Sequence, residues 1–447
     1  MIDTKKLRQR ILDLAIRGKL VPQDPNDEPA SVLLDRIRAE KERLIAEGKI
    51  KRSKTKKSTT DDKSHYQQPF PIPDSWEWVR LEEILDLVSG QDFPPEKYND
   101  KNIGIPYITG ASNIENGHLL VNRWTQFPSV LSKENDLMVV CKGAGVGKMA
   151  YNTIGKVHIA RQIQAIRDYS GLFDMDYIKA VIACNIDSII GKANGLIPGL
   201  KRELLLGLFI PMPPALEQQR ISKRIKELQE SIDNLESSGK AILEEVYSAK
   251  SKILELAITG KLVPQNPDDE PTSELLKRIN PKAEIVTDNE HYPQLPDNWC
   301  LVRLEDILDY EQPQAYIVSS TDYDDGNPTP VLTAGKSFII GYTCEDTGIY
   351  NNLPCIIFDD FTTDSKYVDS PFKVKSSAMK ILRPKGEVNL EYIRWFMSIT
   401  RLSGDTHKRY WISEYAKIPI PLPPINEQNN IVMKISELFG LLDNIVQ

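Results

Sequence analysis

The sequence predicts an α+β protein in which two domains, each a curved β-sheet with helices, are separated by a pair of long antiparallel coiled-coil helices. Three blocks of sequence occur twice along the 447 residues. A heptad pattern of apolar residues continues for about five heptads in the middle of the chain. Two long segments between the blocks combine short β-rich runs with Gly and Pro. Because the blocks follow one another in circularly permuted order, we also expect a pseudo-two-fold axis.

The repeat is clearest in its first block, where fifteen of nineteen aligned residues are identical at a separation of 242 positions. The copies keep their order through all three blocks, so chance similarity does not explain them. The matched pairs are ILDLAIRGKLVPQDPNDEP (Ile11–Pro29) with ILELAITGKLVPQNPDDEP (Ile253–Pro271), PDSWEWVRLEEILDL (Pro73–Leu87) with PDNWCLVRLEDILDY (Pro296–Tyr310), and IPMPPALEQQRI (Ile210–Ile221) with IPLPPINEQNNI (Ile420–Ile431).

The blocks that form helices are contiguous only in the middle of the chain. Their other copies lie at the two ends of the sequence. If the fold has a pseudo-two-fold axis, the two ends meet and rebuild the second helical region. We therefore expect residues after Glu427 and before Gly18 to pack end to end along the central helix.

The central helical region has a coiled-coil seam. Apolar or small residues recur at alternating spacings of four and three from Ile221 to Leu256, which is a heptad pattern. Gly260 and Pro264 end this helix, because glycine suits the left-handed position past a helix end and proline cannot continue the helix. A helix from Glu217 to Thr259 would be ~65 Å long. A plain helical hairpin inside one core is the open alternative.

The matched blocks also set the expected domain boundaries. Residues 38–65 include the lysine-rich stretch EKERLIAEGKIKRSKTKKSTTDDK, which has no apolar period and predicts a polar linker. The expected parts are an outer helical region of residues 1–37 and 425–447, this linker, a first long segment of residues 66–214, a central helical region of residues 215–291 and a second long segment of residues 292–424.

Several classes of function lack the residues they need. The stretch KGAGVGKM (Lys142–Met149) suggests a phosphate-binding loop, but Lys142 and Met149 replace the first Gly and the Ser/Thr of that motif. A tight turn between strands is the better interpretation. The five cysteines form no C-x-x-C pair and indicate reduced thiols, and we find neither a metal site nor a catalytic constellation. We expect no signal peptide and no membrane span.

Taken together, the layout resembles the specificity subunit of type I restriction–modification systems. The resemblance rests on GKLVPQDPNDEPAS and GKLVPQNPDDEPTS, on the paired PPxxEQ motifs, and on PDSWEWVRLEEIL and PDNWCLVRLEDIL, which look like the starts of target recognition domains. It covers essentially the whole chain. The two long segments diverge between their matched ends, which indicates two related modules with different specificities.

The resemblance implies a non-catalytic subunit that binds double-stranded DNA. Each recognition domain would read one half of a split target, and the helices would set the gap and dock two methyltransferase subunits. Endonuclease/translocase subunits would join that core. S-adenosylmethionine, ATP and magnesium would be bound by the partner subunits, and this chain would hold no cofactor. We expect the complex in the cytoplasm and away from membranes.

Candidate DNA contacts come from basic and amide side chains in the two long segments. Phosphate contacts supply affinity, whereas Arg and Gln can also bond base edges. The candidates in the first segment are Lys142, Lys148, Arg161, Gln162 and Gln164, and those in the second are Thr362, Thr363, Lys366, His407, Lys408, Arg409 and Tyr410.

The net charge argues against DNA binding. The chain carries a formal charge of -7, and an acidic protein repels the phosphate backbone unless its basic residues gather on one face. A scaffold that joins two partner proteins without touching DNA is therefore the alternative. An enzyme is disfavoured because its motifs are missing.

Overall fold

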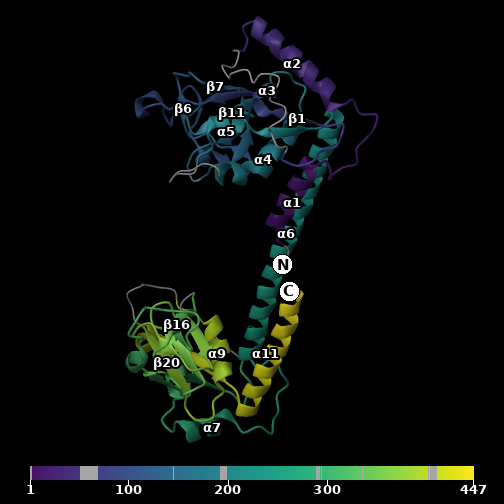
Figure 1. Ribbon diagram of the computed structural model, residues 1–447. Helices are drawn as coiled ribbons and strands as arrows, with labels where there is room; N and C mark the ends of the chain where they lie inside the picture. Colours follow the sequence, from purple (N-terminus) through teal and green to yellow (C-terminus); the bar gives the residue numbers. More distant parts are fainter. Residues whose placement is uncertain are drawn as a thin grey trace. The chain divides into compact units, whose positions relative to one another are not determined.

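The protein folds as two compact units, Ile2–Ser237 and Ser238–Gln447. Both combine helices with β-sheets (Figure 1), so the expected α+β class with two domains is confirmed. The computed structural model describes residues 3–50, 69–143, 145–191, 199–287, 292, 294–333, 337–400, 402 and 410–446.

The first unit contains a β-rich part that we call the first β domain. Its strands are β1 (Glu77–Arg80), β2 (Asp86–Ser89), β3 (Ile105–Ile108), β4 (Ile114–Glu115), β5 (His118–Leu119), β6 (Trp124–Thr125), β7 (Leu131–Ser132), β8 (Leu137–Val140), β9 (Met149–Tyr151), β10 (Val157–Ile159), β11 (Ile163–Arg167) and β12 (Phe209–Met212). Its helices are α3 (Leu81–Ile84), α4 (Met175–Gly191) and α5 (Arg202–Leu206). The larger sheets have the orders β2–β11–β8–β9 and β6–β3–β10–β7, and β3 and β10 pair in parallel.

The second unit contains the second β domain. Its strands are β13 (Cys300–Arg303), β14 (Leu308–Glu311), β15 (Thr329–Leu332), β16 (Ile339–Thr343), β17 (Cys355–Asp359), β18 (Ser365–Val368), β19 (Lys373–Val374), β20 (Met379–Pro384) and β21 (Pro419–Leu422). Its helices are α7 (Thr272–Ile279), α8 (Leu304–Ile307), α9 (Leu390–Ile399) and α10 (Tyr410–Ser413). The sheets have the orders β14–β20–β17–β18 and β16–β15–β19, with β15 and β19 parallel.

One long helix, α6 (Ala215–Ile258), belongs to both units. It has 44 residues, which agrees with the helix that the heptad pattern predicts. Its first turns enter the core of the first unit through Ile221 and Ile225, and its last turns enter a separate core of the second unit through Leu254 and Ala257. The alternative of a helical hairpin inside one core is therefore wrong.

Each end of the chain forms a helix that packs antiparallel against α6 within its own unit (Figure 1). In the first unit, α1 (Thr4–Ile16) places Arg8 2.6 Å from Asp233. The chain after α1 returns to the start of α6, where Gln23 bonds Glu217 at 2.9 Å. In the second unit, Asp443 of α11 (Ile425–Val446) lies 2.6 Å from Lys250. The antiparallel helix pairing is thus confirmed in both units.

The middle of the heptad seam differs from the expectation of a continuous buried stripe. Ile232 and Val246 are buried, but Leu235 is 53% exposed and Ile242 is 46% exposed. A seam residue is buried only where neighbouring side chains cover it, and Leu235 and Ile242 are not fully covered. Met1, Ile2 and Gln447 lie outside the described residues, and the end-to-end packing of the outer helices stays a prediction.

Glycine ends the two matched helices as predicted. Gly18 and Gly260 have φ angles of 65° and 70°, which only glycine adopts without strain. Lys19 N donates to Leu14 O and Lys261 N donates to Leu256 O, both at 2.9 Å. These bonds satisfy helix-end carbonyls by the usual left-handed cap.

The repeated blocks meet in one buried cluster in each unit, which we call the joint. In the first unit Glu217 accepts hydrogen bonds from the Trp76 indole at 3.0 Å and from Gln23 at 2.9 Å. In the second unit Glu427 accepts the same two bonds from Trp299, at 2.9 Å, and from Gln265. Each joint thus takes one residue from each of the three blocks, which explains why all three are repeated.

Each joint also holds the next element of its β domain. Gln218 accepts a bond from Asp174 N at 3.1 Å, just before α4 begins. The equivalent Gln428 accepts one from Asn389 N at 2.8 Å, just before α9. The PPxxEQ motif therefore fixes the start of the long helix against the helix that covers each β domain.

The expected polar linker is partly helical. Helix α2 (Ala30–Ala46) extends into the 38–65 range. Leu44 is only 8% exposed, and Lys41 Nζ donates to Glu82 O of α3 at 2.7 Å. Leu44 and the half-buried Lys41 thus attach this stretch to the domain, whereas residues 51–65 lie outside the described residues.

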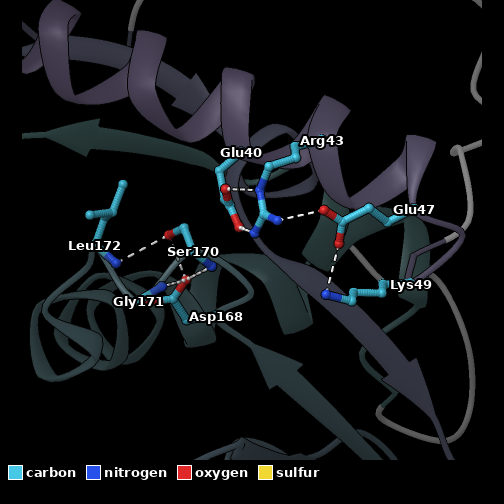
Figure 2. Close-up of polar contacts among 8 residues, drawn as sticks. All are labelled: Glu40, Arg43, Glu47, Lys49, Asp168, Ser170, Gly171 and Leu172. Atoms are coloured by element: carbon cyan, nitrogen blue, oxygen red, sulfur yellow. Dashed lines mark hydrogen bonds and ion pairs between the residues drawn. The ribbon is translucent and has the colours of Figure 1, made fainter.

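A chain of ion pairs runs from the last turns of α2 into the residues that follow it (Figure 2). Arg43 lies 2.5 Å from both Glu40 and Glu47, and Lys49 lies 2.7 Å from Glu47. The bond from Arg43 lowers the pKa of the Glu40 carboxyl. Figure 2 also shows the nearby turn in which Asp168 accepts bonds from Ser170 N and Gly171 N. Exposed pairs of this kind add little stability and suit a solvated helix face.

Candidate nucleic-acid interface

The two β domains share one backbone scaffold despite their divergent sequences. The sheet β2–β11–β8–β9 has the same order and strand directions as β14–β20–β17–β18. Cys141 N donates to Gln162 O at 2.7 Å, and Asp360 N donates to Ala378 O at 3.0 Å. Cys141 and Asp360 therefore occupy the same position, directly after β8 and β17.

A second shared bond links the same position to the segment that follows the covering helix. Leu200 N donates to Cys141 O at 2.8 Å, and Tyr410 N donates to Asp360 O at 2.9 Å. The glycine turn Lys142–Lys148 of the first domain thus corresponds to the Phe361–Asp364 turn of the second. The sequence placed candidate contacts in both turns without indicating that they are equivalent.

The glycine turn is the tight turn that the sequence predicts. It connects β8 to β9, with Gly147 N bonded to Val140 O at 2.9 Å and positive φ angles at Gly143 and Gly147. Lys142 is exposed at its start. Lys148 is also exposed, and its ammonium lies 3.4 Å from the carbonyl of Ile114.

Two further candidates of the first domain lie beside this turn. Arg161 and Gln162 are exposed in the turn between β10 and β11. The Gln162 amide oxygen lies 2.4 Å from the place a Cβ would take on Gly110, so that glycine makes room for it. Arg161 Nε is 3.2 Å from Asp92. The structure therefore brings Lys142, Arg161 and Gln162 to one end of the sheet, where β8 finishes and β11 begins.

Gln164 lies elsewhere. It is in β11, opposite Val139 and Ser89, and is only 8% exposed. Side chains alternate between the two faces of a strand, so this amide lies inside the domain and not at its surface.

The candidates of the second domain come from two stretches of sequence, one around Thr362 and one that ends at Tyr410, and hydrogen bonds link the two. Thr363 Oγ1 accepts a bond from Leu402 N at 3.4 Å, and Asp360 holds Tyr410 N. Thr362 and Lys366 are exposed, whereas Thr363 and Tyr410 are 1% and 4% exposed and support the turn from inside. His407, Lys408 and Arg409 lie outside the described residues.

Two features of this interface escaped the sequence analysis. Phe361 stands 38% exposed at the tip of the second turn, and Asp360 forms a buried ion pair with Lys380 beneath it. The sequence signal for the pair is two acidic residues, Asp359 and Asp360, directly after the apolar run CIIF, and one lysine inside the run MKIL. Only the strand register shows that these two residues meet.

Two other kinds of site are missing from the described residues, a metal-binding cluster and a membrane span. They contain no group of three or more His, Cys, Asp or Glu side chains that could hold a metal ion. The helices within the described ranges include none with the length and hydropathy of a membrane span.

Comparison with known proteins identifies the family. Residues 73–245 match the family described as the type I restriction modification DNA specificity domain. The chain is 30% identical over 388 residues to the type I restriction enzyme EcoAI specificity subunit of Escherichia coli, and 31% identical over 387 residues to the EcoEI specificity subunit of the same organism. Each alignment covers 68% of this chain and 62% of the relative, so the chain spans less than two thirds of these relatives.

The fold agrees with this assignment. A chain from a solved structure concerned with complex assembly and conformational transition of the type I R-M system superposes with a TM-score of 0.56 at 16% sequence identity, covering 85% of this chain and 93% of that one. At that identity the likeness speaks for the fold alone. Together with the sequence matches and the repeated joints, it shows that this chain belongs to the family of type I restriction–modification specificity subunits.

Proposed function

We propose that this chain is the DNA-recognition subunit of a type I restriction–modification complex. Each β domain binds one half of a bipartite duplex target, and the bound complex directs adenine methylation or restriction by partner subunits. The observation that carries the proposal is the shared scaffold of the two β domains. Equivalent turns after β8 and β17 present different side chains, as two readers of different sequences require.

The exposed side chains suit the two kinds of DNA contact. Lys142 and Lys366 can bind phosphates, which supplies affinity without sequence choice. Gln162 and Thr362 carry hydrogen-bonding groups that can reach base edges, and a Gln amide can bond adenine with two hydrogen bonds. The tight backbone of the glycine turn also allows a phosphate to approach closely.

Partner subunits complete the proposed activity. The net charge of -7 predicts weak DNA binding by the chain alone, so two methyltransferase subunits would enclose the DNA and raise its affinity. These subunits would bind S-adenosylmethionine, and endonuclease/translocase subunits would bind ATP and magnesium. This chain would be non-catalytic, hold no cofactor and act in the cytoplasm.

Methylome sequencing of the host with and without this gene tests the proposal. We expect a bipartite motif, methylated at adenine in both halves, that disappears when the gene is deleted. A methylome that does not change would contradict a role in DNA recognition. Replacing the second β domain by that of another family member should change one half of the motif and leave the other intact.

A DNA shift assay separates this function from the alternative scaffold. The full chain with its methyltransferase subunits should bind a duplex carrying the motif more tightly than one with both halves scrambled. The readout is the affinity for the motif duplex divided by the affinity for the scrambled duplex. If the chain were a scaffold without DNA contacts, this ratio would be the same as for the methyltransferase subunits alone.

A further inference from the structure

The second β domain has a buried ion pair directly beneath its candidate DNA-binding turn. Lys380 Nζ lies 3.1 Å from Asp360 Oδ2, with side-chain exposures of 0% and 1%, although the contact lacks hydrogen-bond alignment. The ammonium also donates to Gln312 Oε1 at 3.0 Å. Burying two charges is costly even when they are paired, so this pair calls for a reason beyond stability.

Asp360 joins three segments of the domain through its backbone and side chain. Its N–H donates to Ala378 O, its carbonyl accepts from Tyr410 N, and its Oδ1 accepts from Trp411 N at 2.8 Å. Lys380 ties the remaining carboxylate oxygen to β20. The turn after β17 and helix α10 are thereby held in one arrangement.

The Phe361–Asp364 turn is itself held in place by Asp359, the residue before Asp360. Asp359 Oδ1 accepts bonds from Phe361 N at 2.8 Å and Thr362 N at 3.1 Å. Thr363 has a φ of 57°, which a β-branched residue adopts only when its surroundings impose it. Exposed Phe361 and Thr362 are therefore held by Asp359, whose neighbour Asp360 anchors this end of β17 to the segments around it.

The first β domain builds the same scaffold without these charges. Cys141 makes the two backbone bonds that Asp360 makes, and Gln164 occupies the place of Lys380, opposite Val139 where Lys380 is opposite Phe358. The fold thus needs no ion pair at this position. The Asp360 side chain adds an acceptor for Trp411 N that Cys141 lacks, and the Lys380 ammonium beside its second oxygen fixes the orientation of that acceptor.

We propose that the Lys380–Asp360 pair positions the DNA-reading turn of the second β domain and so determines how well that domain discriminates its half-site. The inference rests on the proposed function. Lys380 and Asp360 are positioning residues, because both are buried and act through Phe361, Thr362 and α10.

The test neutralises the pair while keeping its shape. An Asp360→Asn/Lys380→Gln double variant retains an acceptor for Trp411 N and resembles the neutral arrangement of the first domain, and neutral replacements of a buried pair are often tolerated by the fold. A matched control, Glu270→Gln/Arg278→Gln, removes the same charges from an exposed pair 2.7 Å apart in the same unit. Both variants are studied as the full chain with its methyltransferase subunits.

The readout is discrimination at each half-site, measured with duplexes that carry the intact motif or one altered half. One wrong base pair weakens specific binding by roughly 5- to 150-fold. We expect the double variant to lose about tenfold of its discrimination at the half-site of the second domain and to stay within about twofold at the other. The control should match the unaltered protein at both.

Three results would overturn the proposal. Full discrimination in a folded double variant would mean that the pair does not position the turn. An equal loss at both half-sites would mean a global effect. If the double variant does not fold, the milder Asp360→Asn variant is judged by the same criteria, and failure of both to fold would make the pair a folding requirement instead. A wild-type complex without a bipartite motif would already reject the proposed function, before any variant is made.

Discussion

Trp76 Nε1 donates a hydrogen bond to Glu217 Oε2 at 3.0 Å, although the two residues are 141 positions apart in the chain. Trp299 and Glu427 make the same bond at 2.9 Å in the second unit. These bonds tie the first strand of each β domain to the start of a long helix. The joint is therefore a structural unit that the chain builds twice.

Removing the indole donor should weaken each joint. A Trp76→Phe or Trp299→Phe variant leaves one oxygen of a buried carboxylate without its donor, which costs about 1–3 kcal/mol. Trp78→Phe is the matched control, because Trp78 Nε1 is buried without a hydrogen-bond partner among the described residues. Urea unfolding of the three variants measures the difference. Equal losses in all three would show that ring size, and not the hydrogen bond, matters.

Lowering the pH should stabilise the joints, whereas protonation of most carboxylates in folded proteins is destabilising. Burial raises the pKa of Glu217 and of Glu427 above the ordinary value of 4.5. A carboxyl with a raised folded pKa stabilises the fold below its unfolded pKa and loses that contribution as the pH rises through the folded pKa. The unfolding free energy of the protein minus that of Glu217→Gln should therefore fall as the pH rises above the ordinary carboxyl pKa of 4.5.

Glu345 provides a control of opposite sign. Lys373 lies 2.9 Å from it and lowers the pKa of the Glu345 carboxyl below 4.5. Its contribution is present above the unfolded pKa and is lost as the pH falls through the folded pKa. The unfolding free energy of the protein minus that of the Glu345→Gln variant should therefore decrease as the pH is lowered. The same trend for Glu217 and Glu345 would contradict the assignment of the two shifts.

The glycines at the helix ends should not tolerate a side chain. A Cβ on Gly18 or Gly260 would lie 2.5 Å from Pro73 or Pro296, and the left-handed backbone costs about 1–2 kcal/mol more for any other residue. Gly18→Ala and Gly260→Ala should each lower the unfolding free energy by at least that amount. Gly239→Ala is the control, because its Cβ would meet nothing within 4 Å and alanine favours a helix by about 1 kcal/mol.

The two kinds of DNA contact should separate in salt titrations. Lys142→Ala or Lys366→Ala should reduce the slope of log affinity against log salt by about one if each lysine makes the phosphate contact that we propose for it. Gln162→Ala should leave this slope unchanged and reduce sequence specificity at one base pair of the half-site. Lys49→Ala serves as the control, since this lysine pairs with Glu47 directly after α2 and belongs to neither turn. An unchanged slope in both turn variants would remove these lysines from the interface.

The sequence by itself determined the repeated plan of the protein. Heptad spacing, the glycine and proline helix ends and the three repeated blocks are local patterns, and local patterns specify helices, caps and turns. The long helix, its antiparallel partners in each unit and the α+β class followed from them. The family resemblance rested on the same blocks, because the joint needs one residue from each.

Only the tertiary structure decided what the divergent segments have in common. The equivalence of Cys141 with Asp360 depends on strand register and on backbone bonds, which carry no side-chain signature. Gln164 lies inside the sheet because the alternation of β11 turns it there. The pairing of Asp360 with Lys380, and the exposure of Leu235 in the seam, likewise depend on which distant segments cover a residue. Burial is a property of packed neighbours, and the neighbours here are far apart in sequence.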